Sequence, residues 1–143
     1  MIAPARQLPL SLLLLRLGVG LVMAMWTLDK FINPDHAGAV FSNFYGLDAQ
    51  GPLVLMVLGL VQGVVVIAFL AGALRTLSYG AVFAMHAVST LASWRQYFDP
   101  FENLLFFAAW PMLAACFALF LLRRSDTLIS VDQIMTARRE TAA

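Results

Sequence analysis

Two polar stripes interrupt otherwise apolar segments of this chain. Each follows i, i+3, i+4, i+7 spacing and so occupies one face of a helix. The first stripe is Trp26, Asp29, Lys30 and Asn33, and the second is His86, Ser89, Thr90 and Ser93. Histidine titrates near neutral pH, and a carboxylate and an amine beside it can exchange protons with a ligand. If the two stripes converge, they form a small polar pocket at the depth of a quinone head group.

The same residues also have a purely structural interpretation. Asp29 and Lys30 are adjacent and can simply mark the membrane boundary, and His86 can hydrogen-bond to a neighbouring helix. The candidate pocket residues are Trp26, Asp29, Lys30, His86 and Arg95. The secondary polar candidates are Arg16, His36, Gln62 and Asp99. We assign no catalytic residue and no metal ligand, and quinone is the only candidate cofactor.

Two polar side chains lie deep inside apolar segments. A cation in the middle of a membrane helix costs about 3 kcal/mol on insertion scales. Arg16 must therefore either extend its guanidinium to the head groups or pair inside the bundle, and the sequence favours the first. Gln62 lies near the middle of the second apolar run, where an amide can bridge two helices, and we expect that role for it.

Four apolar runs must position these residues: 8–28, 52–71, 76–92 and 103–122. A hydrocarbon core of about 30 Å needs about 20 apolar residues per helix. Of all residues 62% are hydrophobic and 12% are charged, against roughly 25% charged in a soluble domain. The sequence therefore predicts an all-α integral membrane protein, an antiparallel four-helix bundle. In a three-span alternative, the second and third runs form a re-entrant hairpin.

The cations indicate the orientation, because Lys and Arg collect on cytoplasmic flanks. With four spans the two termini share a side, and that side holds six of the nine Lys and Arg residues. They are Arg6, Arg75, Arg123, Arg124, Arg138 and Arg139. We therefore expect a multi-pass protein of the cell inner membrane with both termini cytoplasmic. Residues 1–124 would form the membrane domain, and 125–143 a cytoplasmic amphipathic tail.

The connections predict two further helices. Asn33 and Pro34 begin a short helix in the first outer loop, Gly46 ends it, and its apolar face suits the membrane interface. In the tail, Ser130 and Gln133 have the spacing of a capping box, which predicts a short basic helix. Anionic lipid or a partner subunit could hold that helix.

Several function classes are excluded. The sequence has no phosphate-binding loop, no HExxH motif, no nucleophile elbow and no basic face for nucleic acid, which argues against NTPases, zinc proteases, hydrolases and nucleic-acid binders. Cys116 is the only cysteine, so the chain has no internal disulfide or CxxC pair. A single haem held by His36 and His86 stays open as a minor alternative.

The chain resembles the DoxX family of small four-helix membrane proteins over nearly its whole length. The resemblance rests on short matches in a similar order: Arg16-Leu17-Gly18, Leu28-Asp29-Lys30-Phe31, Asn33-Pro34, Gly46, Gly72 to Arg75, His86 and Ser130-Val131-Asp132. Members often carry a glutamate where Gln62 stands here, and an amide cannot exchange a proton near neutral pH.

The resemblance implies a role in membrane redox or sulfur chemistry. Three functions follow as alternatives: a subunit of a membrane oxidoreductase that contributes a quinone-binding pocket, a non-catalytic accessory subunit that docks onto a larger membrane complex, or, least favoured, a small transporter. The lipid bilayer and other membrane subunits are the expected partners. Whether the chain is an enzyme stays open.

Overall fold

The computed structural model describes residues 4–47 and 51–142, which contain six α-helices, two 3₁₀ helices and no strand. The α-helices are α1 (Pro4–Ile32), α2 (Pro34–Tyr45), α3 (Pro52–Leu70), α4 (Arg75–Ala92), α5 (Ala109–Leu121) and α6 (Val131–Thr141). The 3₁₀ helices η1 (Trp94–Phe98) and η2 (Leu104–Ala108) lie between α4 and α5. The predicted all-α class is confirmed.

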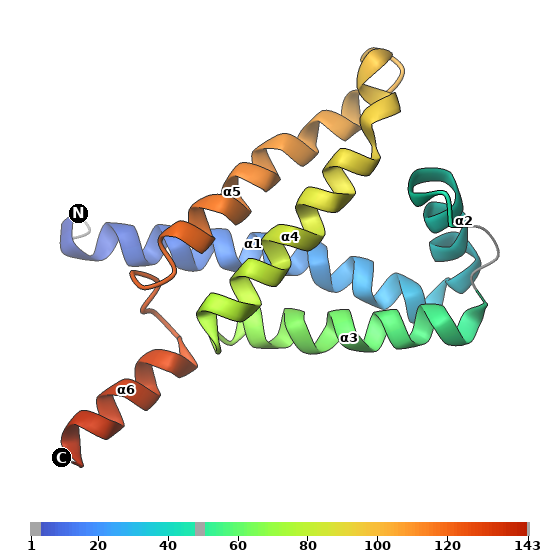
Figure 1. The fold of residues 1–143 in the computed structure, drawn as a ribbon. Coiled ribbons are helices and arrows are strands. Elements are labelled where there is room, and N and C mark those ends of the chain that lie inside the picture. The colour runs from blue at the N-terminus through green and yellow to red at the C-terminus, as the bar shows by residue number, and fades with distance from the viewer. Residues whose placement is uncertain (1–3, 48–50, 143) are drawn as a thin grey trace.

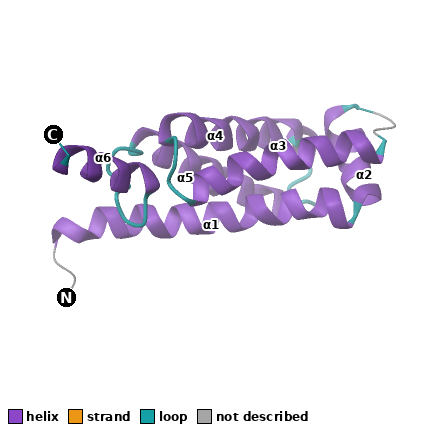
Figure 2. Ribbon diagram, turned by 90° about the horizontal axis from the view of Figure 1, so that it is seen from below, coloured by secondary structure: helices purple, strands orange, loops and turns teal. Residues whose placement is uncertain are grey.

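The helices form two antiparallel pairs (Figure 1). Helix α1 packs along α3, and α4 packs along α5 in a hairpin that crosses the first pair at an angle. Helix α2 lies at one end of the molecule and α6 projects from the other, as both views show (Figures 1 and 2). We call these the α2 end and the α6 end.

Two glycines let α1 and α3 approach closely. A Cβ at Gly20 would collide with the side chain of Leu70, and one at Gly59 would lie 2.8 Å from the ring of Phe31. Without a hydrophobic force between helices in lipid, such close backbone contact is a main source of helix association. The buried core lies toward the α6 end. It is built from Leu12, Val19, Met23, Val66, Phe69, Tyr79, Val82, Cys116 and Leu119.

Within the described ranges, three segments are long and apolar enough to cross a membrane: Gln7–Ile32, Pro52–Leu70 and Leu104–Leu121. Their outward side chains are apolar; Leu21 is 64% exposed and Ile67 is 70% exposed. Surface of this kind suits lipid and not water. The structure therefore indicates a multi-pass membrane protein in contact with the bilayer. The expected third run, 76–92, is helical as α4 but is not among the three segments.

The helix predicted after Asn33 forms at the predicted position. Helix α2 begins at Pro34 after Asn33 and ends at Gly46, which adopts φ 64°. A residue without Cβ adopts this left-handed conformation readily, and its N–H closes the last turn on the carbonyl of Ser42. The fourth run differs from the expected single α-helix, because residues 104–108 form the 3₁₀ helix η2 before α5 begins at Ala109.

The tail contains the expected helix, α6, but the capping box is wrong. Ser130 precedes α6 and makes no side-chain bond to that helix. Its hydroxyl donates to the carbonyl of Gly72 at 2.9 Å, in the turn between α3 and α4. The first part of the tail is thus attached to the turn between α3 and α4.

Candidate functional site

A cavity of about 1500 Å³ runs beside α1, lined by residues of α1 to α5 and η2. Both polar stripes contribute to its α2 end, through Trp26, Asp29, Lys30, His86, Ser89, Thr90 and Ser93. The two stripes therefore line the same cavity, except for Asn33, which is not among its lining residues. Most of the remaining lining is aliphatic or aromatic, so the cavity is apolar along its length and polar at one end.

His86 is, with Thr90, one of two polar residues of this cavity that are only 1% exposed. Its side chain is buried, and its Nε2 lies 3.1 Å from the carbonyl oxygen of Ala109. Because a carbonyl only accepts, Nε2 carries the proton in the neutral ring. The Thr90 hydroxyl donates to the His86 carbonyl at 2.8 Å, so it does not supply a proton to the ring.

The other ring nitrogen, Nδ1, has no hydrogen-bond partner among the described residues although it is buried. Buried polar atoms are nearly always paired, and an orphan of this kind needs an explanation. With the proton on Nε2, Nδ1 presents a lone pair and would accept a hydrogen bond from a ligand.

Trp26 packs against His86 from α1. Their ring centroids are 5.8 Å apart with the planes tilted by 33°. Trp26 is 40% exposed and lines the cavity, while His86 lies beneath it. The indole and the imidazole thus lie next to each other at the polar end of the cavity.

A contact between an acidic and an imidazole side chain joins α1 to α2 beside the cavity. Asp29 Oδ2 and His36 Nδ1 are 2.8 Å apart, and both residues line the cavity. The neighbouring Lys30 donates from Nζ to the Trp26 carbonyl at 3.0 Å and lies 5.8 Å from the centre of the Phe41 ring. Acid, base and ammonium groups thus surround the polar end of the cavity.

The remaining sequence candidates lie elsewhere. Arg95 does not line this cavity; its guanidinium stacks on Trp94 at 5.4 Å, beside a separate small pocket of about 300 Å³. Asp99 does not line either pocket. Gln62 borders the cavity but donates to the Met23 carbonyl at 3.3 Å, so it bridges α3 to α1 as expected.

Arg16 contradicts the expectation that it extends to the head groups. It is fully buried, and its Nη1 lies 3.4 Å from Asp126 Oδ2. Its Nη2 donates to the carbonyls of Leu128 and Ile129, at 2.8 and 3.0 Å, and Tyr79 donates its hydroxyl to Asp126 at 2.6 Å. The tail thus supplies a buried counter-ion, because an unpaired guanidinium at this depth would be far more costly.

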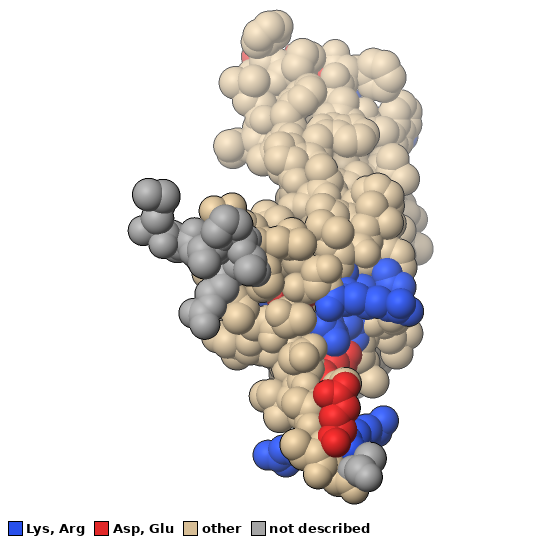
Figure 3. Space-filling view, turned by 90° about the vertical axis from the view of Figure 1, so that its left-hand side faces the viewer, with Lys and Arg blue, Asp and Glu red and all other residues tan. Residues whose placement is uncertain are grey.

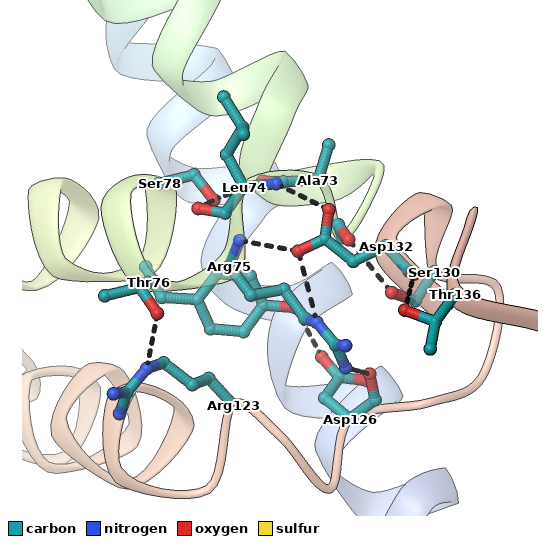
Figure 4. Close-up of polar contacts among 12 residues, drawn as sticks. Ala73, Leu74, Arg75, Thr76, Ser78, Arg123, Asp126, Ser130, Asp132 and Thr136 are labelled. Carbon is teal, nitrogen blue, oxygen red and sulfur yellow. Dashed lines mark hydrogen bonds and ion pairs between the residues drawn. The ribbon is translucent and has the colours of Figure 1, made fainter. Parts of the chain in front are cut away.

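A second set of contacts holds the tail against the turn between α3 and α4 (Figure 4). The carboxylate of Asp132 accepts from the backbone N–H groups of Leu74 and Arg75, both at 2.9 Å, and lies 3.4 Å from Arg75 Nε. In return, the N–H of Val131 donates to Ala71. We call the residues Arg16, Gly72, Arg75, Tyr79, Asp126, Ser130 and Asp132 the clasp.

The Asp132 carboxylate is tuned by these contacts. Partial burial alone would raise its pKa, but the two backbone N–H donors and the Arg75 guanidinium together lower the pKa below its ordinary value of 3.8. The clasp therefore contains a carboxylate that stays ionised well into mildly acidic solution.

The face of the molecule at the α6 end carries a group of charged side chains (Figure 3). On this face, Lys, Arg, Asp and Glu side chains gather in the lower part, down to the tip of α6, and the upper part carries almost none.

Sequence reasoning missed the clasp as a unit. Asp126 follows Arg123 and Arg124 in a polar tail and looks like a solvated residue. The available signal was Arg16, since a cation inside a span requires a counter-ion. The described residues contain no group of three or more His, Cys, Asp or Glu side chains that could hold a metal ion.

Comparison with protein-family models, with curated proteins and with solved structures finds no match for this chain.

Proposed function

We propose that this chain is a small inner-membrane subunit of an oxidoreductase of the DoxX type, and that the α2 end of its cavity binds the head group of a quinone or quinol. The observation that carries the proposal is the unpartnered Nδ1 of buried His86 under the Trp26 ring. An aromatic ring with hydroxyl groups satisfies both features, because it stacks on indole and donates to Nδ1.

The proposal includes four membrane crossings, with α4 as the third. The polar residues that lower its hydropathy point inward: Ser78 is 4% exposed, and His86 and Thr90 are 1% exposed. Its outward residues include Leu77, Val88 and Leu91, which are 56–71% exposed. A helix of this pattern can face lipid on one side and protein on the other.

In this arrangement the α6 end is cytoplasmic. It holds Arg75, Arg123, Arg124, Arg138 and Arg139, whereas the α2 end holds Lys30 and Arg95. The proposed head-group site then lies near the outer surface of the inner membrane. The Asp29–His36 pair stands between that site and the outer water and is suited to receive or supply protons as the ligand changes oxidation state.

Binding can be tested in lipid nanodiscs with Trp94→Phe and Trp110→Phe, which leave Trp26 as the only tryptophan. An added alkyl quinol, the form of the ligand that can donate to Nδ1, should quench Trp26 fluorescence saturably. His86→Gln keeps an amide near the Nε2 position, where it can still donate to Ala109, but removes the Nδ1 acceptor. We expect it to weaken quinol binding about tenfold.

His86→Asn places its amide near the Nδ1 position and should retain more of the affinity than His86→Gln. Leu91→Val, on the lipid-facing side of the same helix, is the control and should bind as the parent does. Quenching that rises without saturation, or equal affinity in all variants, would refute the head-group site.

The second candidate function is that of an accessory subunit, and helix α6 favours it. No residue of α6 is buried, although the clasp anchors its first turn. Such a helix is well suited to bind another subunit. Deletion of residues 133–143 leaves the clasp intact, so loss of co-purifying subunits with unchanged thermal stability would support this role. Full retention of those subunits would contradict it.

A further inference from the structure

The cavity extends well beyond the proposed head-group site. From Asp29 it follows α1 back to Ser11, a distance of about 27 Å at about 1.5 Å per residue. Along this path α1 contributes mainly apolar side chains: Leu14, Leu15, Val19, Val22 and Met23. The hydroxyl of Ser11 donates its proton to the carbonyl of Gln7.

The size of the cavity exceeds what a head group needs. Pockets for drug-sized ligands usually have volumes of about 300–1000 Å³, and this one has about 1500 Å³. Its acidic and basic side chains, Asp29 and Lys30, lie only at the α2 end. The shape and polarity therefore match an amphiphile with a polar head at the α2 end and a hydrocarbon chain pointing toward the α6 end.

Gly18 lies on the apolar part of this path. A Cβ built on Gly18 would meet no atom within 4 Å, and Gly18 lines the cavity. Gly20, two residues further along, differs, because a Cβ there would collide with Leu70. Packing within the protein thus explains the glycine at position 20 but not at position 18, where the free space belongs to the cavity.

We propose that this apolar part of the cavity holds the hydrocarbon tail of the same quinone, laid along α1 with its end toward the α6 end, and that Gly18 keeps the path open. This inference rests on the proposed head-group site, with which the tail path forms one continuous cavity. The occupant is the tail of the bound ligand and not a bilayer phospholipid.

The position of the tail can be measured directly by photocrosslinking in nanodiscs. Two alkyl quinones are needed, one with a diazirine next to the ring and one with a diazirine at the end of the tail. The first should label the protein around Trp26, and the second should label residues between Ser11 and Gly18. Unlabelled alkyl quinone should compete with both.

Gly18→Leu places a branched side chain on the path, at a position where an added Cβ meets no atom within 4 Å. It should abolish at least about nine-tenths of the tail-end labelling between Ser11 and Gly18 and leave the ring-end labelling unchanged. Leu21→Phe, on the lipid-facing side of α1 where Leu21 is 64% exposed, is the matched control and should alter neither.

The two proposals fail in different ways. Without ring-end labelling at Trp26, the head-group site itself is wrong. Ring-end labelling together with tail-end labelling on lipid-facing residues such as Ile67 would overturn the tail path alone. Tail-end labelling could instead be reduced by added phospholipid and not by unlabelled quinone. That result would assign the apolar part of the cavity to bilayer lipid and would also overturn the tail path.

Discussion

Arg16 and Asp126 form an ion pair of 3.4 Å between Nη1 and Oδ2, and both side chains are completely shielded from solvent. One belongs to α1 and the other to the segment between α5 and α6. The pair therefore joins the first transmembrane helix to the tail, and it accounts for a cation that lies far inside an apolar run.

Removal of either charge should destabilise the protein strongly. Breaking a buried pair on one side typically costs about 3–5 kcal/mol, because the remaining charge stays buried and unpaired. Asp126→Asn should thus lower the thermal unfolding temperature in detergent and make the tail accessible to protease. The double variant Arg16→Met, Asp126→Leu should recover part of that loss, since it leaves no lone charge. Equal unfolding temperatures for Asp126→Asn and the parent would contradict the role of this pair.

Gly72 and Gly18 should respond oppositely to alanine. At Gly72 a Cβ would collide with Arg16 Nη1 and lie 3.0 Å from the Ser130 Cα, and the residue has φ +61°. Gly72→Ala should therefore disrupt the clasp and lower the unfolding temperature. Gly18→Ala meets open space within a helix and should leave stability unchanged or raise it by up to about 1 kcal/mol. Thermal unfolding of the two variants side by side is the measurement.

Acid should loosen the tail. Because the pKa of Asp132 is lowered in the folded protein, its carboxylate contributes stability that is fully present above the ordinary pKa of 3.8 and is lost as the pH falls through the lower folded value. Protease cleavage between α5 and α6 should accelerate at pH values below about 4. At neutral pH the protease should cleave Asp132→Asn faster than the parent. The difference between the two cleavage rates should shrink in acid. A difference that stays constant across this range would argue against the carboxylate.

The number of crossings can be determined with single cysteines. Cys116 is buried, so it should not react with an impermeant maleimide. Leu47, Glu102 and Thr141 are exposed. A cysteine introduced at one of these positions should react when the reagent is on the same side of the membrane. Four crossings predict labelling of Leu47→Cys and Glu102→Cys from outside intact cells, and of Thr141→Cys only after permeabilisation. If α4 does not cross, Leu47→Cys and Glu102→Cys will react on opposite sides.

Composition and periodicity indicated that the helices lie in lipid, and they predicted the fold class and the polar faces of the helices. A chain with 62% hydrophobic residues in long runs must satisfy its backbone within helices. Helical spacing alone placed Trp26 and His86 on faces that could meet, and Asn33, Pro34 and Gly46 marked the ends of α2. These features depend on neighbours within a turn or two, so they are readable from a linear pattern.

Tertiary structure alone decided which distant residues pair. Asp126 serves as the counter-ion of Arg16 only because the tail folds back over the turn at Gly72. For the same reason the Ser130 hydroxyl donates to the Gly72 carbonyl and not to a group of its own helix. Likewise, the His86 Nε2 donates to the Ala109 carbonyl only because α4 packs against α5, and Nδ1 is left without a partner among the described residues. Such contacts arise from the packing of whole helices, whose relative positions no local spacing encodes.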